Sequence, residues 1–378
     1  MRTNQNELRI AVFLPSLAGG GAERVFADLS GEFAVLGYSV DLVLASAHGQ
    51  YLPDVSARVR IIDLRAGGVL SSLPKLVRYL RSERPHVMLS GLDHVNIVAI
   101  VACALAGGRT RSVISMRSVP TAVCAEDWSV RGWVILQLIK NVYRFADSIV
   151  GNSSAVVHDL DRFRHIPARK IAVIYNPLDI NRIVLLSHAQ VDHPWLAEGT
   201  TPVVLGVGSL AVLKDFPTLI RAFALARSRC TCRLIILGEG PDRAALESLV
   251  HELDLDGEVL LPGFVVNPFA WMKRARVFVS SSLTEGCPNA LMQALACGTQ
   301  IVSTACPGGS AEILEGGKWG RLVPVRNSIA MAEAIVASMG ETIRLNVQER
   351  AADFALATIA REYLQILLPS RMSVEHQS

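Results

Sequence analysis

Glu285 is the first residue whose surroundings suggest chemistry. It follows an apolar, strand-like run at residues 276–279 and a polar loop, and it precedes Pro288. Proline is tolerated at a helix start, and the apolar spacing over residues 290–295 predicts a helix. Because free N–H groups at a helix start attract anions, Glu285 and Gln293 could hold a sugar and its phosphates there. The alternative is a strand–loop–helix connector with a capping glutamate.

Lys214 is the second candidate, and it also follows an apolar run. It lies between a strand expected at residues 202–208 and a helix expected at residues 216–228. A cation at that place could neutralise a diphosphate leaving group. An isolated lysine is more often a solvated surface residue, but Glu285 follows a strand of the same half of the chain and favours the functional interpretation.

A glycine-rich loop at residues 19–21, near the N-terminus, is the third candidate. It joins a buried strand at residues 8–14 to a helix at residues 22–36, and glycines let backbone N–H groups approach a phosphate closely. The rival interpretation is a dinucleotide-binding fingerprint, but Arg24 occupies the position of its third glycine. Asp41, the candidate ribose ligand of that motif, stands at the start of its strand and should point away from the ligand edge.

Composition excludes several classes of protein. The 378 residues suggest about two domains, and 51% hydrophobic residues are ample for buried cores. A net charge of +3 gives no argument for nucleic acid. The seven cysteines are scattered without a CxxC pair, so we expect neither a zinc site nor disulfides, and a reducing cytosol fits best. No signal peptide is visible, and the longest apolar run, residues 97–106, falls short of the ~20 residues that a membrane span needs.

The elements that must position these residues follow a strand–helix alternation that occurs twice. We expect an α/β protein with a first domain at residues 1–184 and a second at residues 185–345. Residues 346–378 should form a long helix over 346–367, which returns to the first domain, and a disordered tail. In parallel α/β sheets ligands bind at the carboxyl ends of the strands, and each polar loop singled out here lies at such an end. Expected strands lie at residues 8–14, 38–45, 58–63, 85–90, 112–115, 148–152, 170–174, 202–208, 233–237, 259–261, 277–280, 300–303 and 320–323.

Three motifs of the second half carry a resemblance to a known family. They are Gly208-Ser-Leu with Lys214-Asp, then Gly238-Glu-Gly-Pro, then Glu285-Gly with Gln293-Ala and Gly298. Together they resemble the donor domain of retaining glycosyltransferases of family 4. Leu17–Arg24 and Asn176-Pro in the first half are also similar to that family, and the likeness covers about residues 8 to 365. It implies the GT-B fold, in which two Rossmann-like domains face each other across a cleft.

Two positions depart from the family's pattern. Ser209 stands where the family usually has a diphosphate-binding arginine, and Gln293 replaces the second glutamate of a paired-glutamate motif. Glutamine keeps a carbonyl acceptor for a ribose hydroxyl but loses the charge. Arg117, which ends a strand of the first domain, is our candidate for the replacement charge. The alternative for Arg117 is an ordinary surface or interdomain salt bridge.

The resemblance implies a hexosyltransferase that needs no metal or cofactor and retains the anomeric configuration. The expected donor is a UDP-sugar carrying N-acetylhexosamine, galactose or glucose, with residues 262–265 holding the base through backbone atoms. Two alternatives stay open: a catalytically silent sugar-nucleotide-binding protein and a UDP-sugar epimerase on the same scaffold. The candidate catalytic residues are Lys214, Glu285 and Arg117, and the candidate substrate-binding residues are Gly20, Gly21, Ser209, Gly240, Gly263, Phe264, Gly286, Cys287, Pro288, Asn289 and Gln293.

The acceptor is implied only by the family's usual work on surface polysaccharides. We expect a glycan or a polyprenyl-diphosphate-linked oligosaccharide, and a cytoplasmic protein that works at the inner face of the plasma membrane. Basic residues on two expected helices would then rest on an anionic membrane; the alternative is two solvated helix faces. These residues are Lys75, Arg78, Arg81 and Arg84 on one helix, and Lys140 and Arg144, with Trp133, in the segment 128–144.

Overall fold

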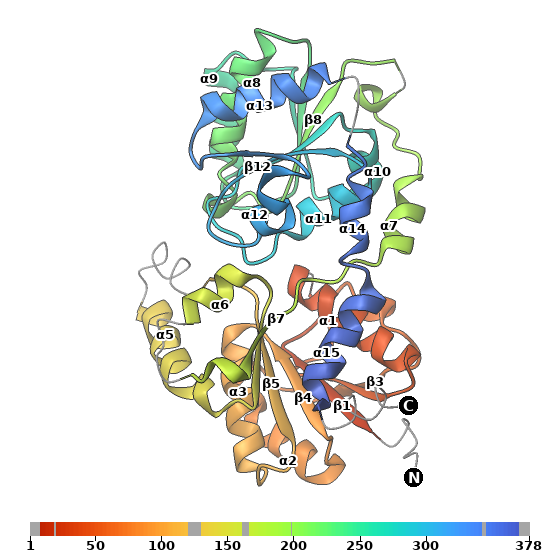
Figure 1. Cartoon of the computed structure of the whole chain (residues 1–378), viewed down its shortest axis with the longest axis vertical. Coiled ribbons are helices and arrows are strands. Elements are labelled where there is room, and N and C mark those ends of the chain that lie inside the picture. Colours follow the sequence, from red (N-terminus) through yellow and green to blue (C-terminus); the bar gives the residue numbers. More distant parts are fainter. Residues whose placement is uncertain are drawn as a thin grey trace. The chain divides into compact units, whose positions relative to one another are not determined.

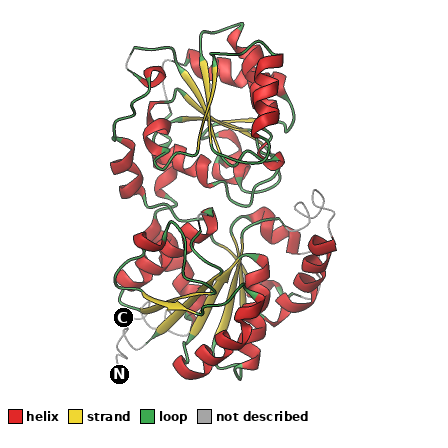
Figure 2. Cartoon of the chain, turned by 180° about the vertical axis from the view of Figure 1, so that it is seen from behind, coloured by secondary structure: helices red, strands yellow, loops and turns green. Residues whose placement is uncertain are grey.

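The computed structural model describes residues 8–18, 20–119, 130–160, 166–197, 199–341 and 345–369. The chain divides into two compact units. One unit contains residues 1–177 together with 356–378, and the other contains residues 178–355. Each unit is a parallel sheet with helices on both faces (Figures 1 and 2).

The first unit holds a seven-stranded sheet of order β3-β2-β1-β4-β5-β6-β7. All of its strand pairs are parallel, as expected when helices connect successive strands. Its strands are β1 (Arg9–Leu14), β2 (Ser39–Leu44), β3 (Arg60–Asp63), β4 (Val87–Gly91), β5 (Arg111–Met116), β6 (Ser148–Gly151) and β7 (Ile171–Val173). Its helices are α1 (Gly21–Val35), α2 (Leu73–Glu83), α3 (Asp93–Leu105), α5 (Val130–Val142), α6 (Ser154–Leu160) and α15 (Leu356–Leu367).

The second unit holds a six-stranded parallel sheet of order β10-β9-β8-β11-β12-β13. Its strands are β8 (Val203–Val207), β9 (Arg233–Leu237), β10 (Val259–Gly263), β11 (Val277–Ser280), β12 (Gln300–Thr304) and β13 (Arg321–Val323). Its helices are α7 (Ile180–Ser187), α8 (Phe216–Arg227), α9 (Arg243–Glu252), α10 (Phe269–Arg274), α11 (Asn289–Ala296), α12 (Ser310–Ile313), α13 (Ser328–Gly340) and α14 (Gln348–Ala352).

The prediction of one long terminal helix over residues 346–367 is wrong in one respect, because the structure has two helices there. α14 belongs to the second unit, and α15 belongs to the first. Between them Phe354 is buried and its carbonyl accepts a hydrogen bond from the Leu178 N–H at 2.7 Å. A helix continuing through Phe354 would use that carbonyl internally, so the contact with Leu178 keeps α14 and α15 from joining into one helix.

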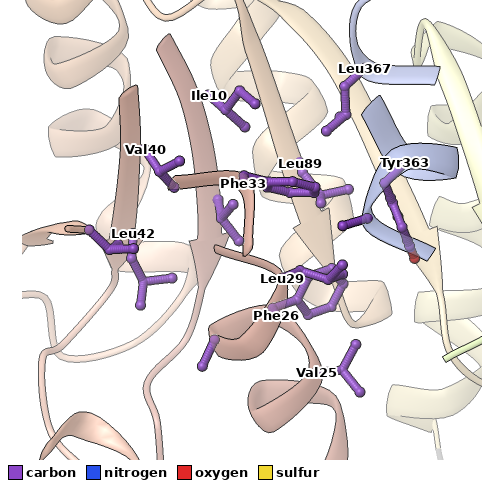
Figure 3. Close-up of a cluster of buried hydrophobic side chains, with 14 of the residues drawn as sticks. Ile10, Val25, Phe26, Leu29, Phe33, Val40, Leu42, Leu89, Tyr363 and Leu367 are labelled. Carbon is purple, nitrogen blue, oxygen red and sulfur yellow. The ribbon is translucent and has the colours of Figure 1, made fainter. Parts of the chain in front are cut away.

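α15 does return to the first unit, as the sequence predicts. Its apolar face completes the core between α1 and the sheet, and Figure 3 shows Tyr363 and Leu367 beside residues of α1 and the strands. Tyr363 and Phe33 are fully buried in this cluster. Burial of large side chains of this kind contributes roughly 1.5–3 kcal/mol each, so the C-terminal helix is an integral part of the first unit.

The chain crosses to the second unit after Pro177, whereas the expected domain boundary follows residue 184. The difference comes from α7, which belongs to the second unit. α7 packs on α10, and the Asn267 side chain donates to the Leu186 carbonyl at 2.9 Å. Buried Ile183 anchors the same helix.

Candidate functional site

Two loops of the second unit bring Lys214 and Glu285 together. Lys214 ends a short 3-10 helix after β8, and Glu285 lies between β11 and α11. The Leu283 N–H donates to the Leu213 carbonyl at 2.8 Å, and Ser281 Oγ donates to the Lys214 carbonyl at 2.7 Å. Because β8 and β11 are adjacent and parallel, their loops leave the same edge of the sheet. Lys214 Nζ and Glu285 Oε1 form an ion pair there.

The pair is partly shielded from solvent and leaves one carboxylate oxygen available. The Lys214 side chain is 28% exposed and that of Glu285 is 14% exposed. Glu285 Oε1 also accepts a hydrogen bond from Ser282 Oγ at 2.7 Å. Within the described residues, Glu285 Oε2 accepts no hydrogen bond. A ligand hydroxyl can therefore donate to Oε2. The ammonium of Lys214 has three N–H donors, so it can bind a ligand anion while it stays paired with Glu285.

A glycine loop after β12 fixes the backbone of Glu285. The Glu285 N–H donates to the Pro307 carbonyl at 3.0 Å, and the Gly309 N–H donates to the Gly286 carbonyl at 2.9 Å. Gly308 has a φ of 130°, and a Cβ added there would lie 1.5 Å from the Glu285 carbonyl oxygen. Only glycine allows this approach, so the position of the carboxylate depends on Gly308.

α11 begins directly after this loop. Pro288 is its N-cap and supplies no side-chain hydrogen bond to the first turn. The Cys287 side chain is buried with its Sγ 3.3 Å from Met292 Sδ, so Cys287 presents its backbone rather than its thiol. Gln293 is half-buried, and its side-chain amide makes no hydrogen bond inside the part of the chain that the structure describes. The helix start beside Glu285 thus offers backbone donors for an anion.

The ends of β8 and β9 approach each other closely, which explains their glycines. A Cβ on Gly240 would lie 2.2 Å from the Leu210 carbonyl oxygen, and one on Gly238 would lie 1.8 Å from the Gly208 carbonyl oxygen. The Leu210 N–H donates to the Glu239 carbonyl at 2.9 Å. Gly240 is thus needed for the close packing of these loops. Ser209, one residue before Leu210, is exposed at the same edge.

β10 ends beside an ion pair that sequence reasoning missed. Arg243 pairs with Glu239 at 2.7 Å, and its Nη1 donates to the Leu261 carbonyl at 3.1 Å. The guanidinium lowers the pKa of Glu239. Gly263 has a φ of 94°, and an added Cβ would lie 2.7 Å from Glu239 Oε1, so this pair lines the loop. Phe264, the next residue, is 62% exposed.

The remaining candidates, Gly20, Gly21 and Arg117, lie in the first unit, and Gly19 lies outside the described residues. Gly20 is the N-cap of α1, which starts at Gly21, and Glu23 Oε2 accepts a hydrogen bond from its N–H at 3.1 Å. Arg117 follows β5, and its guanidinium lies over the Phe26 ring, 5.2 Å from the ring centre.

Asp41 is not at the carboxyl end of its strand. It is buried and accepts hydrogen bonds from Arg60 at 2.8 and 2.7 Å and from Tyr79 at 2.6 Å. These bonds occupy both carboxylate oxygens, as expected for a structural ion pair. The dinucleotide-binding interpretation therefore has no ribose ligand at this position.

A polar cluster at the carboxyl edge of the first sheet also escaped the sequence analysis. Asp93 Oδ1 accepts a hydrogen bond from the Tyr143 hydroxyl at 2.9 Å, and Oδ2 accepts one from Ser118 Oγ at 3.5 Å. Burial raises the pKa of Asp93 and raises the pKa of Tyr143 well above its usual value. Asn152 lies after β6 at the same edge. The sequence signal that could have found this cluster is a polar residue shortly after each apolar strand.

The described residues contain neither a candidate metal site nor a helix that could span a membrane. No three or more His, Cys, Asp and Glu side chains gather there in a way that could hold a metal ion. No helix in the described ranges has the length and apolar character needed to cross a membrane.

The two parallel sheets, each with helices on both faces, are those of a glycosyltransferase with GT-B architecture. The model described as "Glycosyltransferase Family 4" matches residues 19–182, and the model described as "Glycosyl transferases group 1" matches residues 201–340. Together they span most of both units. The chain belongs to glycosyltransferase family 4, as the sequence motifs predict.

One similar protein of known activity spans nearly the whole chain. It is the N-acetylgalactosamine-N,N'-diacetylbacillosaminyl-diphospho-undecaprenol 4-alpha-N-acetylgalactosaminyltransferase of Campylobacter jejuni. The two are 29% identical over an alignment that covers 95% of this chain and 99% of the relative. Other relatives are named as lipopolysaccharide-core and colanic acid glycosyltransferases.

Solved structures confirm the GT-B fold. Sucrose-phosphate synthase of Thermosynechococcus elongatus matches with a TM-score of 0.80 and 21% identity, over 98% of this chain and 100% of that one. Anabaena Alr3699/HepE, solved in complex with UDP, matches with a TM-score of 0.76 and 20% identity, over 95% of this chain and 99% of that one.

We predict that Gly308→Ala disturbs the Glu285 loop. The new Cβ has no room beside the Glu285 carbonyl, and the backbone angle is one that alanine rarely adopts. The matched control is Gly316→Ala, where φ is 66° but no atom lies within 4 Å of the added Cβ. In urea unfolding, Gly308→Ala should cost at least ~1 kcal/mol more than the control. Equal costs would show that the loop adapts and does not fix Glu285.

Proposed function

We propose that this protein is a retaining hexosyltransferase that moves a hexose from a UDP-sugar to a glycan or a polyprenyl-diphosphate-linked oligosaccharide in surface polysaccharide synthesis. The observation that carries the proposal is the Lys214–Glu285 pair beside the start of α11. It joins a cation for a diphosphate, a carboxylate for sugar hydroxyls and a helix N-terminus for an anion. The transferred sugar is an N-acetylhexosamine, galactose or glucose.

The donor is proposed to bind the second unit. Anabaena Alr3699/HepE, similar in fold, was solved with UDP and with UDP-glucose, which supports a UDP-sugar here. Gly263 and Phe264 hold the base through backbone atoms, and Gly240 and Ser209 line the neighbouring strand ends. Gln293 accepts a ribose hydroxyl, while Glu285 binds hydroxyls of the sugar. Gly286 and the backbone N–H groups of Cys287 and Asn289, on either side of Pro288, assist the phosphates.

Charge stabilisation without a metal is the proposed source of catalysis. Because Ser209 has no charge, Lys214, which lies beside the start of α11 with Glu285, is the cation assigned to the leaving diphosphate. Gly20 and Gly21 contribute backbone groups, and Arg117 contributes charge from the first unit. Preorganised donors of this kind stabilise the charge that develops as the glycosidic bond breaks.

The reaction proposed for these groups keeps the anomeric configuration. The bond between the anomeric carbon and the diphosphate oxygen breaks, and the acceptor hydroxyl oxygen forms a bond to the same face of that carbon. The hydroxyl proton passes to a phosphate oxygen of the leaving UDP. The acceptor class is supported by the Campylobacter relative, whose name specifies a diphospho-undecaprenol-linked substrate.

We predict that Lys214→Ala and Glu285→Ala each lower the transfer rate by about 10²-fold or more, the order observed when one charge-stabilising group is removed. Donor panels of UDP-sugars with lipid-diphosphate sugars, read by mass spectrometry, measure the rate. Lys318→Ala is the matched control, since Lys318 pairs with Glu315 on the surface at 2.8 Å.

Two results would contradict this assignment. Near-normal transfer by either variant removes that residue from the mechanism. UDP binding by the wild-type protein with neither transfer nor donor hydrolysis favours the silent sugar-nucleotide-binding protein.

We predict that Gln293→Glu keeps most of the transfer activity. Glutamate preserves a side-chain oxygen that accepts a ribose hydroxyl, and the amide of Gln293 has no partner within the described chain that would be lost. The same transfer assay gives the answer, with the KM for the donor measured separately. A folded variant without activity would show that the amide N–H is required.

Membrane contact is proposed on two surfaces of the first unit, at the inner face of the plasma membrane. Lys75, Arg78, Arg81 and Arg84 lie on or just after α2. On α5 and the turn after it, Trp133 and Phe145 are each 62% exposed, near Lys140 and Arg144. Residues 128 and 129 lie outside the described chain. This mixture of apolar and basic side chains suits an anionic lipid surface.

We predict that the protein sediments with vesicles containing phosphatidylglycerol but not with vesicles of phosphatidylcholine alone. Arg78→Ala should weaken this binding about fivefold, the value of one basic residue near a charged surface. Arg229→Ala, at an exposed arginine of the second unit, is the control. Equal sedimentation with both kinds of vesicle, or no effect of Arg78→Ala, would refute the electrostatic contact.

A further inference from the structure

Two polar atoms at the carboxyl edge of the first sheet are buried without a hydrogen-bond partner among the described residues. They are Arg117 Nη1, directly after β5, and Asn152 Oδ1, directly after β6. The two strands are adjacent and parallel, so both residues leave the same edge. One atom is a donor and the other is an acceptor. An unpaired buried polar group is costly and rare in native proteins, so each of these atoms calls for an explanation.

The orientation of the Asn152 amide follows from its neighbours. Its Nδ2 donates to the Arg117 carbonyl at 3.4 Å and to Asn176 Oδ1 at 3.5 Å. Turning the amide over would set its oxygen against two acceptors, so the present assignment is the favourable one. Asn152 is only 2% exposed. Its Oδ1 is therefore a fixed acceptor that lacks a donor.

The Arg117 guanidinium is positioned by an aromatic ring. It lies over the ring of Phe26, which is fully buried. Gly91, the last residue of β4, leaves room for that ring, because a Cβ there would lie 2.0 Å from it. Arg117 forms no ion pair with any residue that the structure describes, so its charge is not compensated by a carboxylate.

The chemistry of the two atoms selects the kind of group that would satisfy them. A phosphate at neutral pH accepts hydrogen bonds from Arg117 but offers no donor to Asn152. An apolar group satisfies neither atom. A carbohydrate hydroxyl both donates and accepts, and a sugar ring carries several hydroxyls at once. Ordered water has the same capacity and is the competing occupant.

We propose that Asn152 is a specificity-determining residue that, together with Nη1 of Arg117, binds hydroxyls of a sugar during transfer. The other N–H donors of Arg117 remain available for the charge role proposed above. This proposal rests on the proposed function and adds a residue that the family motifs do not assign. The sugar is either the one being transferred or the terminal sugar of the acceptor. A site that hydrogen-bonds a substrate hydroxyl discriminates strongly against the analogue that lacks it.

The test combines Asn152→Ala with deoxy-sugar substrates. Each substrate that wild-type protein uses is compared with analogues in which one hydroxyl is removed, first in the donor and then in the acceptor. We expect wild-type kcat/KM to fall on the order of 10- to 100-fold for one particular deoxy position. In Asn152→Ala the same position should lose most of its effect, because the partner atom is already absent.

The deoxy effect that disappears in Asn152→Ala identifies the sugar that Asn152 binds. We call this loss of effect coupling, and it can occur with the donor analogues or with the acceptor analogues. Coupling with a donor analogue assigns Asn152 to the transferred sugar, and the affinity for UDP-sugar should then fall while the affinity for UDP stays constant. Coupling with an acceptor analogue assigns Asn152 to the acceptor, and its KM should rise. If no deoxy position in either arm couples to Asn152, the unpaired atoms bind water and the proposal is wrong.

Asn96 provides the matched control. It is also fully buried in the first unit, but its Oδ1 accepts from Ser90 Oγ at 2.8 Å and its Nδ2 donates to the Ser115 carbonyl at 2.9 Å. Asn96→Ala should lower the melting temperature by about 2–8 °C, because it breaks satisfied bonds. Asn152→Ala should change it by less, since its own bonds are long.

Further measurements distinguish a variant that does not fold from a wrong proposal. If Asn152→Ala does not fold, Asn152→Ser, which keeps a small polar side chain, replaces it in the same measurements. UDP binding monitors the second unit, and near-ultraviolet circular dichroism monitors the aromatic packing. A wild-type protein that transfers no sugar refutes the proposed function. In that case binding of deoxy and parent UDP-sugars and of prenyl-diphosphate sugars still tests Asn152.

Discussion

The candidate site of the second unit is built around an ion pair between two side chains that are 71 positions apart in sequence. Lys214 and Glu285 meet because β8 and β11 are neighbouring parallel strands whose loops leave the same edge. Hydrogen bonds between the loops hold the two backbones, and the glycine loop after β12 fixes the carboxylate. Topology therefore creates the pair, and local close packing sets its geometry.

This pair also sets the charge balance at the strand ends. The ammonium of Lys214 is paired with Glu285, and Ser209 adds no charge at this edge of the sheet. A half-buried pair keeps both groups oriented and limits the desolvation that each suffers alone. In the proposed function, a diphosphate takes a share of the ammonium while sugar hydroxyls bind the free carboxylate oxygen. The pair then acts as a preorganised holder for both parts of a nucleotide sugar.

Apolar runs and glycines made much of the fold predictable from sequence. The strand expected at residues 277–280 is β11, and the helix expected after Pro288 is α11. The break before α15 was missed, because its cause is a hydrogen bond between Phe354 and Leu178. The Arg243–Glu239 pair was missed because nothing in the sequence marks those charges as facing β10. Periodicity thus reports local structure, whereas partners distant in sequence depend on the register of the sheet.

The two sheet edges differ in the chemistry that they offer, although both end parallel strands. The second unit presents close-packed glycines, a helix start and a paired lysine, which suit phosphates and a flat base. The first unit presents side-chain amides, hydroxyls and a guanidinium held over Phe26, and two of these polar atoms have no partner in the described part of the chain. Phosphate cannot satisfy an unpaired carbonyl oxygen, but a hydroxyl can. The carboxyl edge of the first sheet is therefore suited to a carbohydrate. Asn152 supplies the unpaired oxygen that distinguishes this edge from the phosphate-binding edge proposed for the second unit.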